Sequence, residues 1–316
     1  MPASDISLGL IGVGRWGRRL ASTITASPGM RLAAAASRNS DVASLVPADC
    51  RIHRDWQDVV AAPDLQGVVI ATPPHMHAEI LLAAVDAGMA VFVEKPLVTS
   101  RDAAVRLRSQ MKSRRATILV DHIHLFQPAF QALQREAAGL GPLRSITSAA
   151  GKPDETCRGR DMLWDWAPHD LSLCLALAPG GADVTAAHWA GQTAHPERAA
   201  EAVNISLALA GGAPAQITLS TAEPRHRWFA AAYHNAVLVY RDEGGASLMR
   251  LDPGQDIHAT GVPVPFDQKL PLSVAVRRFA DAIRQGDRDR ESFETGLLVV
   301  DMIADIEDRL SRRDRS

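Results

Sequence analysis

Residues 6–17 read ISLGLIGVGRWG, a continuous apolar stretch that runs directly into a glycine-rich turn. Successive apolar positions predict a strand buried on both faces, as in parallel sheets covered by helices. G-x-G-x-x-G after such a strand is typical of a dinucleotide site, in which the glycines make the turn, admit the pyrophosphate and let the helix pack. The positive end of the following helix would meet the phosphates. The residues predicted to border the dinucleotide here are Gly12, Gly14, Arg15, Trp16 and Gly17.

The rest of residues 1–122 repeats this alternation of strand and helix. The pattern predicts strands over 30–37, 67–73, 89–95 and 116–122, and helices that end near 27 and cover 75–88 and 100–113. Gly88 is a C-terminal cap for one helix, and Thr99 or Ser100 is an N-terminal cap for the next. Apolar strands separated by helices predict an α/β fold, with an amino-terminal Rossmann domain built on a doubly wound parallel sheet.

Residues 123–316 have a different pattern. Predicted strands cover 143–151, 183–191, 202–210, 214–222, 227–234 and 236–242, and predicted helices cover 128–138, 164–178, 272–285 and 292–312. Short turns of Gly, Pro or Asn between most of the strands favour an antiparallel meander. We therefore expect a carboxy-terminal α/β domain with an open, mainly antiparallel sheet, which binds substrate and makes oligomer contacts.

Composition limits the classes of function. With 316 residues, 47% of them hydrophobic, the chain is long enough for two domains. Its net charge of −2 gives no basic field for nucleic acid or for an anionic membrane. No signal peptide or membrane-spanning stretch is evident. The widely spaced Cys50, Cys157 and Cys174 favour a reducing compartment, so we expect a cytoplasmic protein.

The end of the second strand bears on the type of cofactor. The sequence there is Ala36-Ser37-Arg38-Asn39, without a carboxylate to bind a ribose 2′-hydroxyl. Ser37 and Arg38 suit the 2′-phosphate of NADP(H), which we favour over NAD(H). In the alternative, Arg38 stacks on the adenine and NAD(H) remains usable.

Histidines follow two of the predicted strands. His75 and His77 come after Thr72-Pro73, and His122 and His124 come after the strand at 116–122. Because ligands of doubly wound sheets lie outside the strand C-termini, the 72–77 loop should border the cofactor. Neither histidine pair has an acidic or cysteine partner at a recognised ligand spacing, so we predict no metal site.

The fourth strand ends in Glu94-Lys95-Pro96. Adjacent strand residues project to opposite sides of the pleat, so the two charges should have different targets. Pro96 lets the preceding bond go cis at small cost, which can fix the direction of Lys95. Lys95 is therefore a candidate reactive group, although a solvated ion pair at a strand end is equally compatible with the pattern.

A further cluster, WDWAPHD, covers residues 164–170. Asp165 is a natural N-cap, and Pro168 would then stand in the first turn of the helix. Asp165 and His169 are four residues apart and share a helix face, so the carboxylate could orient the imidazole for general acid–base chemistry. The alternative is a capping aspartate and a structural histidine. Asp170 is expected to be structural.

In their order, GVGRWG, ATPPHMH, EKPL and WDWAPHD resemble the Gfo/Idh/MocA family of oxidoreductases, over essentially the whole chain. The resemblance implies that the catalytic residues are Lys95, Asp165 and His169. It also implies that Glu94 contacts the cofactor ribose near the nicotinamide, that Lys95 borders the cofactor as well, and that Thr72, Pro73 and His77 line the same cleft. Asp121, where many members carry glycine, and His124-Leu125, where an arginine or tyrosine pair is frequent, depart from the family pattern.

These observations together predict an NAD(P)-dependent oxidoreductase. It would oxidise a secondary hydroxyl of a sugar, nucleotide sugar or cyclitol, or reduce the corresponding ketone, with His122, His124 and Trp166 on the substrate side. The expected assembly is a homodimer or homotetramer that has no nucleic-acid or membrane partner. One alternative is a nucleotide-sensing regulatory protein that keeps the fold without turnover. Another is a reductase of a non-sugar ketone or imine.

Overall fold

A computed structural model describes residues 5–153, 160–190, 202–288 and 290–313. The chain forms two compact units: Met1–Ile123 with Lys269–Val300, and His124–Gln268 with Asp301–Ser316. The expected division placed everything after residue 122 in a second domain. The observed units differ because the chain returns to the first sheet, where Phe279 packs edge-on against Phe92 with 5.7 Å between ring centroids.

A parallel six-stranded sheet forms the centre of the first unit, in the order β3-β2-β1-β4-β5-β6. The strands are β1 Ile6–Ile11, β2 Met30–Ala36, β3 Arg51–His53, β4 Gly67–Ile70, β5 Ala90–Glu94 and β6 Ile118–Asp121. The order reverses direction between β1 and β4, which is the switch point where doubly wound sheets bind ligands. The predicted Rossmann architecture is confirmed.

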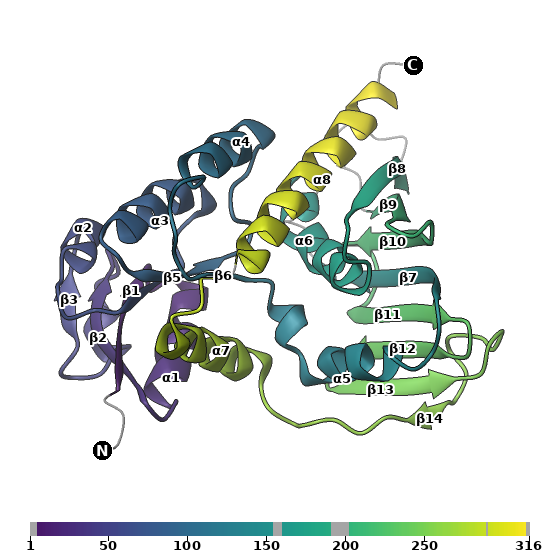
Figure 1. Cartoon of the computed structure of the whole chain (residues 1–316), viewed down its shortest axis with the longest axis horizontal. Helices are drawn as coiled ribbons and strands as arrows, with labels where there is room; N and C mark the ends of the chain where they lie inside the picture. Colours follow the sequence, from purple (N-terminus) through teal and green to yellow (C-terminus); the bar gives the residue numbers. More distant parts are fainter. Residues whose placement is uncertain (1–4, 154–159, 191–201, 289, 314–316) are drawn as a thin grey trace. The chain divides into compact units, whose positions relative to one another are not determined.

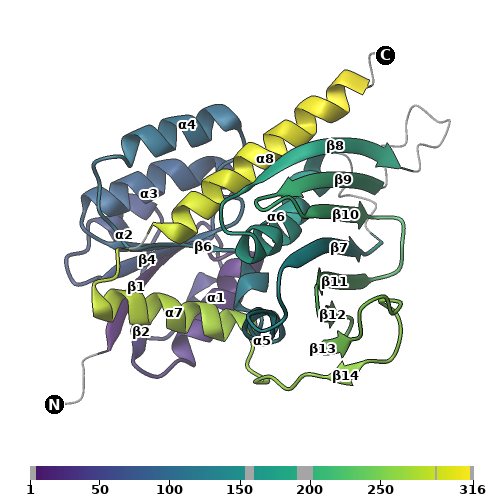
Figure 2. The same ribbon diagram turned by 45° about the vertical axis from the view of Figure 1, so that its right-hand side comes forward.

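Helices cover both faces of this sheet (Figures 1 and 2). The helices on one face are α1 Arg15–Thr25 and α7 Pro271–Gln285, and those on the other are α2 Trp56–Val60, α3 His77–Asp86 and α4 Arg101–Gln110. Two predicted caps are confirmed: Gly88 has φ +79°, and the Ser100 hydroxyl accepts the Ala103 N–H at 3.2 Å. Helix α8, Glu291–Arg313, contributes its residues up to Val300 to this unit.

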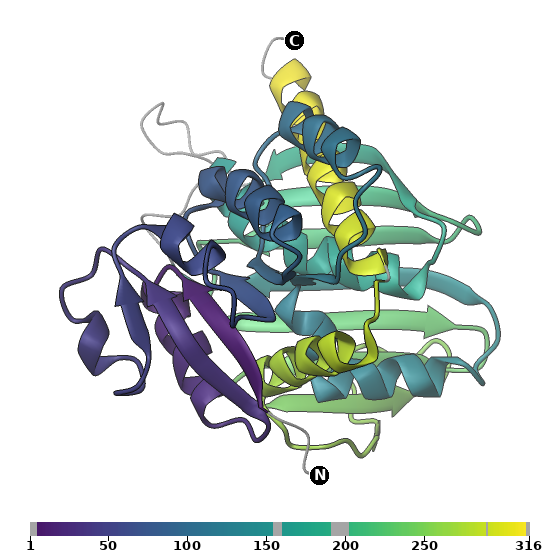
Figure 3. The ribbon, with the colours of Figure 1, turned by 60° about the vertical axis from the view of Figure 1, so that its left-hand side comes forward.

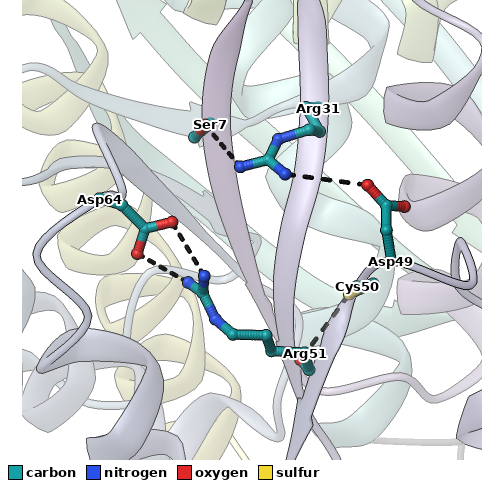
Figure 4. Close-up of polar contacts among 6 residues, drawn as sticks. All are labelled: Ser7, Arg31, Asp49, Cys50, Arg51 and Asp64. Carbon is teal, nitrogen blue, oxygen red and sulfur yellow. Dashed lines mark hydrogen bonds and ion pairs between the residues drawn. The ribbon is translucent and has the colours of Figure 1, made fainter.

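The edge strand β3 and helix α2 were absent from the sequence prediction. Polar contacts hold the edge of the sheet here (Figure 4): Arg51 donates to both carboxylate oxygens of Asp64 at 3.0 and 2.7 Å, and Arg31 pairs with Asp49 at 3.8 Å. Burial, and then the charge of Asp49, raise the pKa of the neighbouring Cys50 thiol to about 11. A three-residue strand with arginine and histidine at its ends has too little apolar pattern to be recognised.

An eight-stranded sheet forms the centre of the second unit, in the order β14-β13-β12-β11-β7-β10-β9-β8; its strands are the teal and green arrows of Figure 3. They are β7 Leu143–Gly151, β8 Ala182–Ala190, β9 Ala202–Leu209, β10 Pro214–Ser220, β11 His226–Tyr233, β12 Val237–Asp242, β13 Ala246–Leu251 and β14 Val262–Pro263. The mainly antiparallel character is confirmed, but β7 lies between β10 and β11 and runs parallel to β10. The sheet is therefore two antiparallel meanders joined by the strand that comes first in the chain, and β13 and β14 were not predicted.

Two helices of the second unit, α5 Pro128–Ala137 and α6 Arg160–Leu177, lie on one face of its sheet (Figures 1 and 2). Every second residue of β9, starting with Val203, is buried, as expected for a strand with one covered face. In the parts of the chain that the structure describes, no helix is both long and apolar enough to span a bilayer.

Helix α6 begins earlier than the sequence predicts. Because it already covers Arg160, Asp165 lies within the helix, and the prediction of Asp165 as N-cap is wrong. Pro168 likewise stands inside the helix rather than in its first turn. Packing explains the earlier start, since Met162 and Leu163 are fully buried and the indole of Trp164 donates to Glu307 at 2.9 Å.

Candidate functional site

The turn between β1 and α1 depends on glycine at three positions for three different reasons. Gly12 has φ +96°, and a Cβ there would lie 2.6 Å from the carbonyl oxygen of Ala71. A Cβ on Gly17 would lie 1.9 Å from the carbonyl oxygen of Gly12. Gly14 has nothing within 4 Å of the place that a Cβ would take, so its backbone faces open space. The turn thus leaves its backbone accessible to a ligand.

That open space is a cleft of about 940 Å³ at the C-terminal ends of β1, β2 and β4. Six of the predicted cofactor residues line it: Gly12, Gly14, Ser37, Arg38, Thr72 and Pro73. The other predicted cofactor residues, Arg15, Trp16, Gly17, His77, Glu94 and Lys95, are not part of its lining as the described residues define it. The guanidinium of Arg19 covers the ring of Trp16 at 4.7 Å, on the helix that follows the turn.

Among the lining residues that sequence reasoning missed are Arg18, Arg54 and Trp56. Arg54 and Trp56 follow β3, and the same rule that places ligands beyond parallel strand ends would have found them had β3 been recognised. Together with Arg38, Arg18 and Arg54 give the cleft three guanidinium groups. Its lining also includes two carboxylates, those of Asp55 and Asp58.

This cleft fits a dinucleotide. The accessible backbone of Gly14 opens helix α1, whose N-terminus carries unpaired N–H groups that favour phosphate. The hydroxyl oxygen of Ser37 accepts the N–H of Asn39 at 3.1 Å, which leaves the hydroxyl hydrogen to donate elsewhere. The residues present would therefore hold a pyrophosphate at Gly14 and an anionic group near Ser37 and Arg38.

Lys95 follows the last residue of β5 and is partly exposed. The Lys95–Pro96 bond is cis, as the sequence suggested. The two ring nitrogens of the fully buried His77 lie 3.0 Å from the carbonyl oxygen of Pro96 and 2.9 Å from that of Thr72. Burial lowers the pKa of His77 despite these two carbonyls. His77 therefore ties the loop after β5 to the loop after β4, and does not face the cleft.

An acidic pair lies beside Lys95. Glu94 and Asp121 are register partners at the ends of β5 and β6, and they are only 8% and 2% exposed. Burial, and then the neighbouring Glu94, raise the pKa of Asp121 well above its usual value. Burial, and then the charge of Lys95, lower the pKa of His122 to about 4. His122 is 1% exposed, so its predicted contact with substrate would require this ring to be uncovered.

In the second unit, His169 of α6 belongs to an aromatic cluster. Its ring packs edge-on against that of His124, with 4.8 Å between centroids. His124 in turn has its Nδ1 3.3 Å from the hydroxyl of Tyr240, which stands on β12. Burial raises the pKa of Tyr240, so its hydroxyl keeps its proton near neutral pH. This cluster brings together two of the predicted site residues and adds Tyr240, which sequence reasoning missed.

The other predicted residues of α6 have distinct surroundings. Asp165 is exposed, while Trp166 is buried with the ammonium of Lys152 6.0 Å from its ring centroid. Asp170 is fully buried and accepts a hydrogen bond from Arg227 of β11 at 2.9 Å. Among the residues the structure describes, no cluster of three or more His, Cys, Asp or Glu side chains is arranged to hold a metal ion.

Comparison with known proteins identifies the family to which this chain is similar. The model of the Gfo/Idh/MocA family matches residues 6–122, and this family is described as oxidoreductases with an NAD-binding Rossmann fold. Inositol 2-dehydrogenase 4 of Saccharopolyspora erythraea is 26% identical over 95% of this chain and 92% of its own length.

Two solved structures are similar to the whole chain. A protein of Magnetospirillum magnetotacticum MS-1, provisionally described as an oxidoreductase, is 35% identical with a TM-score of 0.83, and the match covers 95% of this chain and 99% of that one. A 3-ketoreductase from Actinomadura kijaniata, solved with NADP and TDP-benzene, shares the fold at 20% identity and a TM-score of 0.78, over 97% and 98% of the two chains. With the Rossmann sheet, its glycine turn and the open cleft, these matches establish that the chain is an NAD(P)-binding oxidoreductase of the Gfo/Idh/MocA family.

Proposed function

We propose that this protein transfers a hydride between a nicotinamide cofactor and a secondary alcohol or ketone carbon of a sugar, nucleotide sugar or cyclitol. The observation that carries the proposal is the placement of Lys95. It follows β5, next to β4, whose Thr72-Pro73 loop lines the dinucleotide cleft. The names of the relatives support the substrate class, since one is an inositol dehydrogenase and another a 3-ketoreductase bound to a TDP compound.

The bound cofactor would supply the hydride chemistry, and the side chains of the chain would manage the proton. In the oxidising direction the carbinol carbon loses a hydride to the nicotinamide, and its hydroxyl loses a proton. His169 would take that proton, and Lys95 would donate a hydrogen bond to the same oxygen and stabilise the developing alkoxide. Lys95 could instead take the proton itself. In both cases the products are a ketone, the reduced cofactor and one proton.

Asp165 belongs to the proposed catalytic group as the residue that orients His169. The supporting observation is that both stand on α6, four residues apart, and so share a helix face. His124 would contact the same imidazole, since it already packs edge-on against His169. In this proposal His124 and Trp166 also contribute to the substrate side.

The proposal is tested with the substitutions Lys95→Ala and His169→Ala. Each removes a group from the reacting oxygen, so kcat should fall at least about 100-fold, the usual contribution of a positioned acid or base. NADPH and NADH binding, followed by nicotinamide fluorescence, should stay within a few-fold of the unmodified protein. Lys112→Ala, just after α4, and His234→Ala, in the turn after β11, serve as controls.

Near-normal turnover by both variants on the same substrate would contradict these roles. The substrate itself is to be found with a panel of sugars, nucleotide sugars and cyclitols. Cofactor binding without turnover across that panel would favour the regulatory alternative. Turnover confined to non-sugar ketones or imines would favour the other.

We also propose that the cofactor is NADP(H) rather than NAD(H). Ser37 and Arg38 line the cleft at the end of β2, and Arg54 lines it at the end of β3. Because a guanidinium binds a phosphate through charge-assisted hydrogen bonds, Arg38→Ala should weaken NADPH binding about 10-fold and leave NADH binding nearly unchanged. Equal losses for both cofactors would mean that Arg38 stacks on the adenine instead. Titration of each cofactor by fluorescence distinguishes the two results.

A homodimer or homotetramer is the proposed assembly. On β9, the residues that alternate with the buried ones are only half-buried, so this side of the strand is left partly open for a second copy to cover. Light scattering at micromolar concentration measures the mass directly.

A further inference from the structure

Two carboxyl groups face each other across the ends of β5 and β6. Glu94 and Asp121 are Cα partners in the parallel ladder, so their side chains emerge on the same face of the sheet. Both are buried, and the described structure gives Asp121 Oδ1 no hydrogen-bond partner and no contact with solvent. Two ionised carboxylates in such a place would repel each other strongly and would each lose hydration.

The charges around the pair are few. Lys95 follows Glu94 in the chain, and it acts on Asp121 in the direction that favours ionisation. His122, next to Asp121, is neutral near pH 7 because burial lowers its pKa to about 4. Helix α8 meets β6 through the hydroxyl of Ser292, which accepts the Val120 N–H at 2.9 Å, and through Gly296, and neither contact brings a charge.

One proton on the pair gives this region a balanced charge. With both carboxyl groups ionised, two negative charges would face one ammonium group. With one proton shared, a single negative charge faces Lys95, and a hydrogen bond joins the two carboxyl groups in place of their repulsion. Asp121 is the more deeply buried of the two, so it is the better site for the proton.

We propose that Asp121 is a positioning residue: it stays protonated, donates its hydrogen to Glu94, and so fixes both the orientation and the charge of the carboxylate beside Lys95. It acts through Glu94 and touches neither cofactor nor substrate. The consequence for cofactor binding rests on the proposed function, in which Glu94 contacts the ribose next to the nicotinamide. The shared proton itself does not depend on that function.

The substitutions Asp121→Asn and Asp121→Ala separate donation from ionisation. The amide of asparagine still donates to Glu94 and cannot ionise, so NADPH affinity should stay within about 3-fold of the unmodified protein. Alanine removes the donor that orients Glu94, so NADPH affinity should fall about 10-fold, the usual effect of losing a hydrogen bond to a charged group. Thermal melting identifies any variant that fails to fold.

Infrared difference spectra of the cofactor-free protein detect the proton directly. At pH 7 the unmodified protein should show the carbonyl stretch of a buried protonated carboxylic acid, which shifts in D2O and vanishes in Asp121→Asn. The exposed Asp102→Asn of α4 should leave it unchanged. The band should disappear as the pH is raised and the shared proton is lost.

Absence of a band that depends on Asp121, or NADPH affinity in Asp121→Ala equal to that of the unmodified protein, would overturn the inference. Failure of the unmodified protein to bind either nicotinamide cofactor would instead contradict the proposed function. In that case the infrared result alone would still decide whether the pair shares a proton.

Discussion

Burial fixes the protonation state of single residues around the proposed reaction centre. His77 and His122 stand at 0% and 1% exposure, and burial is the largest cause of the lowered pKa in each. A neutral imidazole has only one N–H, so His77 can donate to one of its two carbonyl neighbours at a time. Because His77 and His122 are neutral near pH 7, the charge at the ends of β5 and β6 comes from Lys95 and from the pair of Glu94 and Asp121.

His122 should make the stability of the protein depend on pH. Its pKa is about 4 in the folded chain and about 6.5 when unfolded, so the unfolded state binds the proton more tightly. Stability from the neutral ring is fully present above pH 6.5 and is lost as the pH falls toward 4, by about 3 kcal/mol in total. Urea unfolding at pH 7 and pH 4 measures this loss in the unmodified protein. In His122→Leu the drop in unfolding free energy between the two pH values should be smaller by about 3 kcal/mol. An identical loss in the variant would mean that His122 is accessible to protons in the folded state.

At the residue scale, the sequence revealed those features that depend on local backbone chemistry. Gly12 and Gly17 are required by contacts within one turn, so a motif of six residues identifies them. Arg54 escaped prediction because the short strand before it, β3, was not recognised. Tyr240 escaped prediction because its partner, His124, lies more than 100 residues earlier in the chain. Asp165 and Pro168 were placed at a helix start because they are good residues for one, while the buried residues before them extend the helix.

At the scale of elements, α6 and β11 are joined by a buried ion pair. Asp170 is fully buried, the Arg227 side chain is 12% exposed, and their atoms lie 2.9 Å apart. The sequence suggested a structural Asp170 but could not identify its partner, because β11 follows α6 only after three other strands and pairs with β7, which precedes the helix. Likewise, no local signal shows that β7 would separate two meanders, since strand order is decided by contacts across the whole sheet.

Removing one member of this pair should weaken the second unit. Arg227→Met leaves the carboxylate of Asp170 buried without its guanidinium, which should cost about 3 kcal/mol of unfolding free energy or more. Arg250→Met is the matched control, because Arg250 and Glu136 lie 3.9 Å apart with side chains that are 45% and 41% exposed. That control should cost less than about 1 kcal/mol. Urea unfolding followed by tryptophan fluorescence measures the loss of unfolding free energy in both variants. Equal losses would show that the buried ion pair contributes no more to stability than the exposed one.

At the scale of the molecule, the two units divide the chain in a way that sequence order does not follow. Helix α7 belongs to the first unit although it follows every strand of the second, because Phe279 packs against β5. A glycine in β4, Gly67, makes room for this helix: a Cβ there would lie 3.1 Å from both Phe279 and Ile283. A single division of the sequence therefore cannot describe these units, because the first unit consists of two separate segments of the chain.

Cofactor binding should reveal which segments unfold together. NADPH at 100 times its Kd stabilises the unit that binds it by about 2.7 kcal/mol, so amides exposed only by unfolding of that unit should exchange about 100-fold more slowly. We expect this protection in β1, β4 and β5 and equally in α7, with little change in β8–β10. Hydrogen exchange followed by mass spectrometry resolves these segments. If α7 exchanged like β8–β10, it would unfold with the second unit, and a single division near residue 122 would describe the chain better than the contacts do.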